Sequence, residues 1–282
     1  MRIRKPAVAG RFYPASKESI IDQIETILSE ELPNINVRFK DNSIIGGVIP
    51  HAGYMFSAFQ AVHFFEIIKQ SQKKYDTIVI VNPNHTGIGH DMAFDSNQAW
   101  ETPLGNVELD IEFGKKLGIP ISEIEQKREH SCEVMIPFLQ YFLNYDFKIV
   151  PITLSRQTYK NAKYLAGKIH KVAQKLNRDI LFIASSDFSH FLSPEKGKEM
   201  DEHVLRNIIL FESQGVEKEV IERNISVCGY GPIMTLMEYS KLLTDKPKVD
   251  ILKMGHSGEI IPSSEVVDYV SLLFTDLNKN SF

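Results

Sequence analysis

The sequence predicts a single α/β domain of three layers, with a mainly parallel central sheet between two layers of helices. Short apolar runs rich in β-branched residues recur along the chain, and segments with helical spacing separate them. Strands that are apolar throughout are typical of a sheet covered on both faces, and strands that alternate with helices favour parallel pairing. No repeat, low-complexity tract or flexible linker divides the chain. We therefore expect residues 1–282 to form one domain.

The first part of the chain is predicted to supply two helices and two strands. Apolar residues recur at helical spacing before Pro33, which ends that segment. A polar stretch follows, and then a short apolar run that two glycines interrupt. The predicted elements are a helix over 19–32, a strand over 44–49, a helix over 58–68, a strand over 77–81 and a loop over 82–89.

The second part repeats the alternation and ends in two further strands. Its helical segments differ in character, because one is rich in Lys and Ala and another is highly charged. The predicted elements are a helix over 134–143, a strand over 148–154, a helix over 159–176, a strand over 180–184, a charged amphipathic segment over 199–223, a helix over 231–243, and strands over 249–252 and 269–274.

Composition excludes several classes of protein. The chain is 43% apolar and 24% charged with a net charge of -4, and its Lys and Arg residues are scattered, so we expect no nucleic-acid partner and no anionic membrane surface. Residues 43–65 carry no formal charge, but Gly46, Gly47 and Pro50 would break a lipid-exposed helix there. A buried strand followed by a turn explains this segment better.

The two cysteines, Cys132 and Cys228, cannot form a disulfide framework and suit a reducing compartment. The charged N-terminus is followed by no apolar segment of the kind found in secretory signals. We therefore expect a cytoplasmic protein.

Polar residues that can bind metals follow three of the predicted strands. His51 follows the first strand, His85 follows the second, and Asp187 with His190 follows the strand over 180–184. Ligands of open α/β sheets bind outside the carboxyl ends of the strands, so these residues are expected to converge. A single histidine in such a loop is more often a hydrogen-bonded structural residue. The repetition favours a shared site.

Rigid turns surround the first two histidines. His51 lies in 50–54 and His85 in 82–87, both flanked by Pro and Gly, which constrain the backbone and can aim a ring. Turns of this composition are also ordinary connections between elements.

Asp187 and His190 are three residues apart. The carboxylate could orient the imidazole, or the pair could supply a general base. The hydroxyls of Ser185 and Ser186 could equally cap the helix that follows.

The segment 129–133 precedes an apolar helix and contains further acidic and basic groups. His130 and Glu133 are candidate proton carriers, although no strand end directs them. Ser131 can serve as a helix cap.

Cys228 lies just before the helix over 231–243. A thiolate is stabilised near a helix N-terminus and is then a better metal ligand and nucleophile. Cys132 is expected to be a packing residue. Two imidazoles and an anionic third ligand are typical of non-haem Fe(II), and a thiolate in third place also makes copper or zinc plausible.

The chain resembles the MEMO (mediator of cell motility) family, which is similar in fold to the class III extradiol non-haem-iron dioxygenases. Seven pieces carry the resemblance in the correct order along nearly the whole chain. They are 10–14 (GRFYP), 50–54 (PHAGY), 82–85 (NPNH), 100–105 (WETPLG), 129–133 (EHSCE), 185–190 (SSDFSH) and 228–229 (CG).

The resemblance implies a single three-layer α/β domain and a metal-binding cleft. His51, His85 and Cys228 match the family's metal-ligand positions, Asp187 and His190 would line the cleft, and His130 and Glu133 would lie near it. The dioxygenases use two histidines and a glutamate, so Cys228 in third place argues against ring cleavage. An unidentified small molecule or peptide is the expected occupant of the cleft.

Three hypotheses follow. The first is a metal-dependent redox protein, in which Fe(II) is bound by His51, His85 and Cys228 while His190, supported by Asp187, carries protons. The second is a metal-free hydrolase or transferase with Cys228 as nucleophile and His190 as base. The third is a non-catalytic pocket that binds an anionic peptide or metabolite at the helix N-terminus over 228–231.

Overall fold

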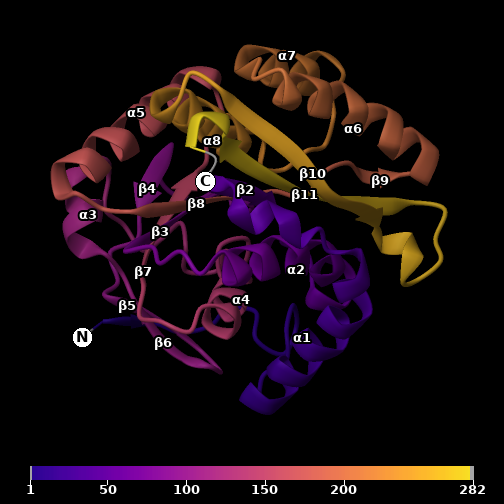
Figure 1. The fold of residues 1–282 in the computed structure, drawn as a ribbon, viewed down its shortest axis with the longest axis horizontal. Coiled ribbons are helices and arrows are strands. Elements are labelled where there is room, and N and C mark those ends of the chain that lie inside the picture. The colour runs from indigo at the N-terminus through magenta and orange to yellow at the C-terminus, as the bar shows by residue number, and fades with distance from the viewer. Residues whose placement is uncertain (1, 280–282) are drawn as a thin grey trace.

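The central sheet has eight strands, of which seven lie in the order β10-β11-β2-β8-β3-β7-β4 and one, β9, pairs with β11. This arrangement is seen in a computed structural model that describes residues 2–279 (Figure 1). The central strands are parallel and lie in the order β2 (Ser43–Ile49), β8 (Ile180–Ser185), β3 (Thr77–Asn82) and β7 (Lys148–Leu154). All four agree with predicted strands. Their carboxyl ends therefore share one edge of the sheet.

Antiparallel strands extend the sheet on both sides. Strand β11 (Val266–Asp276) pairs with β2 and with β10 (Pro247–His256), and β4 (Met92–Phe94) pairs with β7. The short strand β9 (His190–Leu192) pairs with the first residues of β11. The prediction of a mainly parallel sheet thus holds for its centre, and the complete sheet is mixed.

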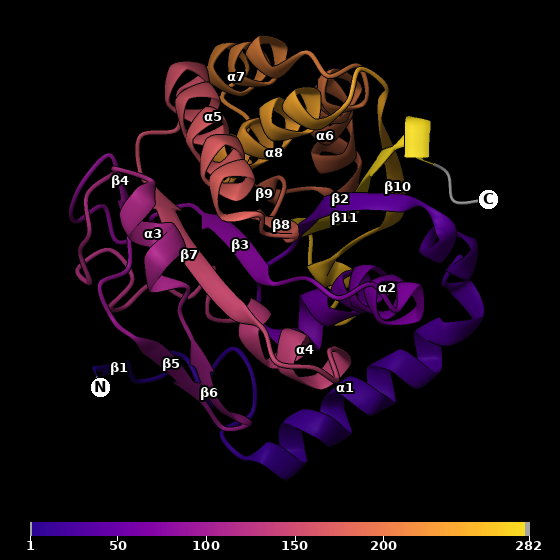
Figure 2. The ribbon, with the colours of Figure 1, turned by 60° about the vertical axis from the view of Figure 1, so that its left-hand side comes forward.

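Helices cover both faces of the sheet, as the prediction of three layers requires (Figure 2). One layer contains α5 (Tyr159–Leu176), α6 (Pro194–Ile209), α7 (Ser213–Glu222) and α8 (Tyr230–Leu243). The other contains α1 (Lys17–Glu31), α2 (Tyr54–Ser71) and α4 (Met135–Phe142), and the short α3 (Ile111–Lys116) packs beside α5 and β7. Among residues 2–279, no helix combines the length and apolar character needed to cross a bilayer.

Local sequence explains where several helices begin. The Ser16 and Thr158 side chains accept hydrogen bonds from backbone amides in the first turns of α1 and α5. Helix α6 begins with a capping Ser193 followed by Pro194, whose missing amide hydrogen costs nothing at this position. The charged segment over 199–223 contains parts of two helices, because the chain turns at Phe211, whose φ is 56°.

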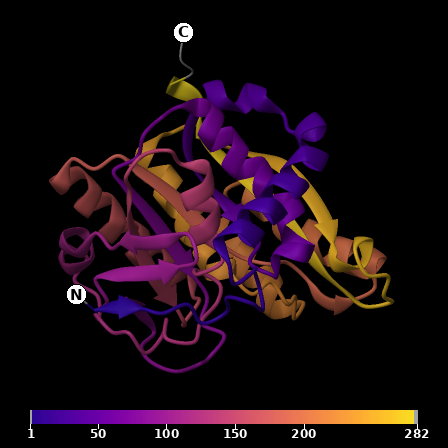
Figure 3. The same cartoon turned by 90° about the horizontal axis from the view of Figure 1, so that it is seen from below.

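Several short elements were not predicted. A small separate sheet contains β1 (Ile3–Arg4), β5 (Ala99–Thr102) and β6 (Gly105–Glu108), on the N-terminal flank of the molecule (Figure 3). These strands of two to four residues are too short to show a periodic pattern. Single 3-10 turns occur at Leu32–Asn34, Val37–Asp41, Ser257–Glu259 and Leu277–Lys279.

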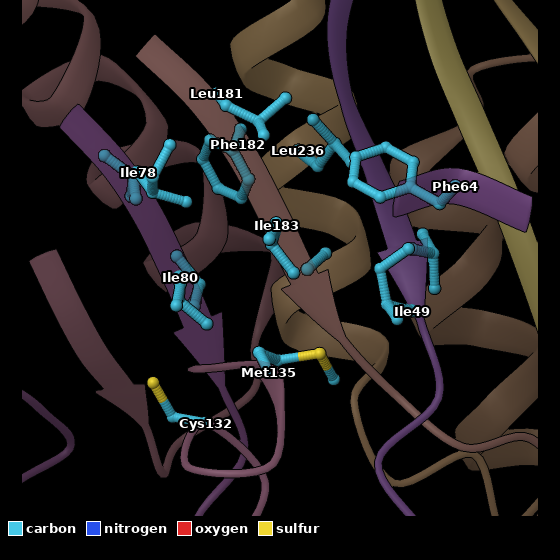
Figure 4. Packing of buried hydrophobic residues seen from close by; sticks show 14 of the residues in the cluster. Ile49, Phe64, Ile78, Ile80, Cys132, Met135, Leu181, Phe182, Ile183 and Leu236 are labelled. Atoms are coloured by element: carbon cyan, nitrogen blue, oxygen red, sulfur yellow. The ribbon is translucent and has the colours of Figure 1, made fainter. Parts of the chain in front are cut away.

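The core lies on both faces of the parallel strands (Figure 4). Phe182 and Cys132 are fully buried, which confirms the packing role expected for Cys132. Strand β2 passes so close to α2 that a β-carbon on Gly47 would lie 2.4 Å from the Phe64 ring. The glycine that interrupts this apolar run therefore permits the close approach of β2 and α2.

Phe182→Ala is expected to lower the free energy of unfolding by about 3–5 kcal/mol, because it leaves a cavity at the centre of the sheet. Urea unfolding followed by circular dichroism measures the loss. Phe191→Ala is the matched control, since Phe191 is 72% exposed and should change stability by less than about 0.5 kcal/mol. An equal effect of the two substitutions would contradict the assigned core.

Candidate metal centre

Three segments meet at the carboxyl edge of the central strands. His51 follows β2, His85 follows β3, and Ser185 is the last residue of β8, which lies between those two strands. Cys228 precedes α8, which packs on β2, β8 and β3. The parallel register therefore brings together side chains that are far apart in sequence, as the pattern of strand ends predicted.

His51, His85 and Cys228 each place a ligand atom within 4.8 Å of the others. Cys228 Sγ lies 3.1 Å from His51 Nε2, and the two imidazole centroids are 5.1 Å apart. Ligand atoms on a single ion with bonds of about 2.0–2.3 Å are separated by about 3–4 Å. The set therefore fits a metal ion after small side-chain adjustments.

The His51 ring has a defined tautomer. Ser185 Oγ donates its single hydrogen to the Ser131 carbonyl at 2.6 Å, and it lies 2.7 Å from His51 Nδ1. Having no hydrogen left to give, the hydroxyl must accept one from Nδ1. Burial, with neighbouring imidazoles, lowers the pKa of His51 well below its usual value, so the ring is neutral. The lone pair on Nε2 therefore points to Cys228.

Glu129 orients His85 in the same manner. Its carboxylate accepts hydrogen bonds from His85 Nδ1 at 2.9 Å and from the His85 backbone amide at 2.6 Å. Burial opposes the charge on Glu129, but the hydrogen bond and the charge of His85 outweigh it and lower the pKa of Glu129 to about 2. A carboxylate that accepts a hydrogen bond from a metal-binding histidine is common in protein metal sites. Glu129 lies in the segment 129–133 but was not among the predicted site residues.

His130 lies beside the group. Its ring stacks on His85 with centroids 4.7 Å apart and contacts Phe12 at 4.5 Å. Burial lowers the pKa of His130 to about 4. His130, His85 and Glu129 form a second cluster of ligand types, but Glu129 Oε1 already accepts hydrogen bonds from the side chains of His85 and Ser131 and from two backbone amides. This cluster is better explained as the support of His85.

Asp187 and His190 have separate hydrogen-bond partners. Asp187 Oδ1 accepts from the His51 amide at 2.7 Å, and burial raises the pKa of this carboxyl to about 6. His190 Nδ1 lies 2.9 Å from the Ser226 carbonyl, to which it must donate. Ser226 rather than Asp187 therefore orients the His190 ring, which differs from the predicted pairing.

Glu133 anchors the N-terminal segment. Its carboxylate is 1% exposed, forms an ion pair with Arg4, and accepts hydrogen bonds from the Tyr13 hydroxyl and the Ala7 and Val8 amides. These partners occupy both oxygens of the Glu133 carboxylate. The structure thus places Glu133 in a supporting role and leaves His130 closer to the chemistry.

The thiol of Cys228 differs from the expectation of a stabilised thiolate. Burial raises its pKa well above the usual value, with Asp187 acting in the same direction. The nearest imidazole nitrogen to Sγ is on His51 rather than on His190, the base of the nucleophile hypothesis. A positive charge beside the thiol favours its ionisation, and a metal ion held by His51, His85 and Cys228 would supply one.

The N-terminus of α8 offers few free donors for an anion. The Gly229 amide donates to Ser186 Oγ at 3.0 Å, and the Gly231 amide donates to Gln157 Oε1 at 2.7 Å. These internal bonds weaken the hypothesis of an anion-binding pocket at residues 228–231.

Comparison with known proteins gives a consistent match. A family model described as "Memo-like protein" matches residues 4–273. A MEMO1 family protein of Methanobrevibacter smithii is 39% identical over 285 residues, covering 96% of this chain and 99% of its own. Another, from Sulfurisphaera tokodaii, is 37% identical and covers 97% of this chain and 100% of its own.

A solved structure supports the fold alone. An uncharacterized protein from Escherichia coli superposes with a TM-score of 0.52 at 12% sequence identity, covering 76% of this chain and 91% of that one.

Glu133→Ala is expected to lower the free energy of unfolding by about 3–5 kcal/mol, because it leaves the Arg4 guanidinium buried and unpaired. Urea unfolding measures the effect. Glu101→Ala is the control, since it removes the ion pair with Lys5, which is largely exposed, and should cost less than about 1 kcal/mol. A stable Glu133→Ala protein would refute the anchoring role.

Proposed function

Because the chain belongs to the MEMO1 family of Memo-like proteins, we propose that His51, His85 and Cys228 bind one transition-metal ion in a cleft that serves metal-dependent redox chemistry. The orientation of the two rings carries this proposal. Each imidazole has its Nδ1 tied to a fixed partner, which leaves Nε2 as the ligand atom. A hydrogen bond that fixes Nδ1 and leaves Nε2 unprotonated is typical of histidines that bind metals.

Fe(II) is the ion that we favour. Two imidazoles and one anionic ligand form a set that leaves coordination positions open, as in non-haem iron proteins. The thiolate makes copper and zinc the competing ions, because both accept sulfur ligands. When bound, the ion would supply a Lewis-acid and redox centre next to the thiolate.

The surrounding side chains are suited to proton transfer. His190 has its Nδ1 held by Ser226, so its Nε2 is free to accept or deliver a proton. Asp187 is buried at the same edge and has a pKa of about 6, so it can exchange a proton near neutral pH. His130 is neutral at pH 7 and can act as an acceptor. We assign His190 the principal role because it is only partly buried, whereas Asp187 is 4% exposed and His130 has a pKa of about 4.

The metal site is tested by metal analysis of protein purified without oxygen. We expect about one equivalent of metal in the wild type and its loss in His51→Ala, His85→Ala and Cys228→Ser, because each removes one of three ligands. His90→Ala is the matched control, since His90 lies on the same loop as His85 and is also bonded through Nδ1 to a buried glutamate.

Cobalt substitution adds a spectroscopic readout. Sulfur-to-cobalt charge transfer should be present in the wild type and in Cys132→Ala but absent in Cys228→Ser. Full metal content in Cys228→Ser, or no metal in the wild type, would refute the site. Metal binding without any redox turnover would instead leave a metal-containing binding protein.

Ser185→Ala and Glu129→Gln are expected to weaken metal binding about 10–100-fold, because the first removes the partner of His51 Nδ1 and the second removes the charge and one of the two acceptor oxygens that hold His85. Competition titration with a coloured chelator measures the affinity. Glu125→Gln is the control for Glu129→Gln, since Glu125 bonds His90 in the same way. If Glu125→Gln weakens binding equally, the effect comes from the loop as a whole and not from ring orientation.

A further inference from the structure

Two buried carboxyl groups meet between α6 and β11, outside the metal centre. Asp201 is fully buried on α6 and Asp268 is 7% exposed on β11, and the two carboxyl groups lie close enough to act on each other's pKa. Gly197, one turn earlier on α6, leaves room for the pair, because a β-carbon there would lie 2.1 Å from Asp268 Oδ2. Helix α6 can thus approach β11 closely only with a glycine at this position.

The pair requires a proton. Asp201 Oδ2 and Asp268 Oδ2 are both buried without a conventional donor among residues 2–279. Two carboxylates can form a hydrogen bond only if one of them is protonated, and two buried negative charges in contact would repel each other. Asp201 Oδ1 is already an acceptor, so its Oδ2 is the natural position of the hydrogen.

The same pair holds the segment that leads to His190. Asp201 Oδ1 accepts hydrogen bonds from the Ser189 amide at 3.1 Å and from the Ser189 hydroxyl at 2.6 Å. On the other side, the Asp268 amide donates to the Ser189 carbonyl at 2.8 Å, and the Phe188 amide donates to the Asp268 carbonyl at 2.9 Å. Hydrogen bonds to both α6 and β11 therefore hold Ser189 in place.

We propose that Asp201 and Asp268 share one proton, and that the shared proton keeps α6 and β11 together around Ser189 in a pH-dependent way. This arrangement, which we call the clamp, holds β9 and with it His190 at the edge of the cleft. The clamp is a property of the fold and does not depend on a bound metal. Loss of the proton places two negative charges between α6 and β11, which should separate these elements and release Ser189. The position of His190 then becomes sensitive to alkaline pH.

The charged groups on neighbouring elements do not remove the need for a proton between Asp201 and Asp268. The charged and titratable groups that act on Asp268 are His256 on β10, His190 on β9 and Glu259 in the turn between β10 and β11. Burial raises the pKa of Asp268, Glu259 acts in the same direction, and Asp201 and the two histidines act in the opposite direction. This arrangement suits an ionised Asp268 that accepts the hydrogen of Asp201.

The direction of the pH dependence follows from the burial of Asp201. Burial raises its pKa to about 8, and the neighbouring Asp268 acts in the same direction. A carboxyl whose pKa is higher in the folded state contributes fully below its unfolded value, about 4, and loses that contribution as the pH rises through the folded value. The clamp should therefore be closed at pH 6 and open above pH 9.

Hydrogen exchange of the amides of residues 188–192 tests the clamp. After correction for intrinsic exchange rates, protection in the wild type should fall about tenfold or more between pH 6.5 and pH 9.5. In Asp201→Asn the amide side chain donates the same hydrogen bond without titrating, so protection should stay constant. Glu202→Gln is the control, since it removes one exposed negative charge from the same helix and should behave as the wild type.

Asp268→Asn provides a second test if Asp201→Asn does not fold. Its new amide can donate to the Asp201 carboxylate, so it too should remove the pH dependence. Constant protection in the wild type would overturn the proposal, and so would an alkaline loss of protection that persists in the folded Asn variants.

Discussion

The parallel register of β2, β8 and β3 is the constraint on which the rest of the site depends. Because β8 lies between the other two, its last residue, Ser185, is placed beside the loops that carry His51 and His85. A shift of one residue would turn each side chain to the opposite face of the sheet and move the strand ends relative to one another, which would separate the ligands. The buried strands that form the core therefore also fix the geometry of the metal centre.

Much of this arrangement could be predicted from sequence, because strand ends and buried strands leave strong local signals. The central strands, the main helices and the convergence of His51 and His85 agree with the pattern of strand ends, and Cys228 joins them as the family resemblance implied. Family membership adds support that the strand pattern alone could not give.

The partners of those residues could not be predicted, because they depend on three-dimensional contacts between distant segments. Glu129 and Glu133 have the same side chain and lie four residues apart, yet the first supports His85 and the second anchors Arg4. The expected pairing of Asp187 with His190 rested on their short separation in sequence, whereas Ser226, 36 residues further on, holds the His190 ring. Spacing identified the segments, and packing decided the function of each side chain.

The anchoring of the N-terminal segment has a consequence for synthesis on the ribosome. Phe12, which covers His130, emerges early, but Glu133, which fixes that segment, follows Arg4 by 129 residues. Cys228 follows His51 by 177 residues. The N-terminal segment that covers His130 and the third ligand, Cys228, therefore become fixed at different times. An ion that arrives before Cys228 has been synthesised meets only His51 and His85. Complete coordination must wait until most of the chain has been translated.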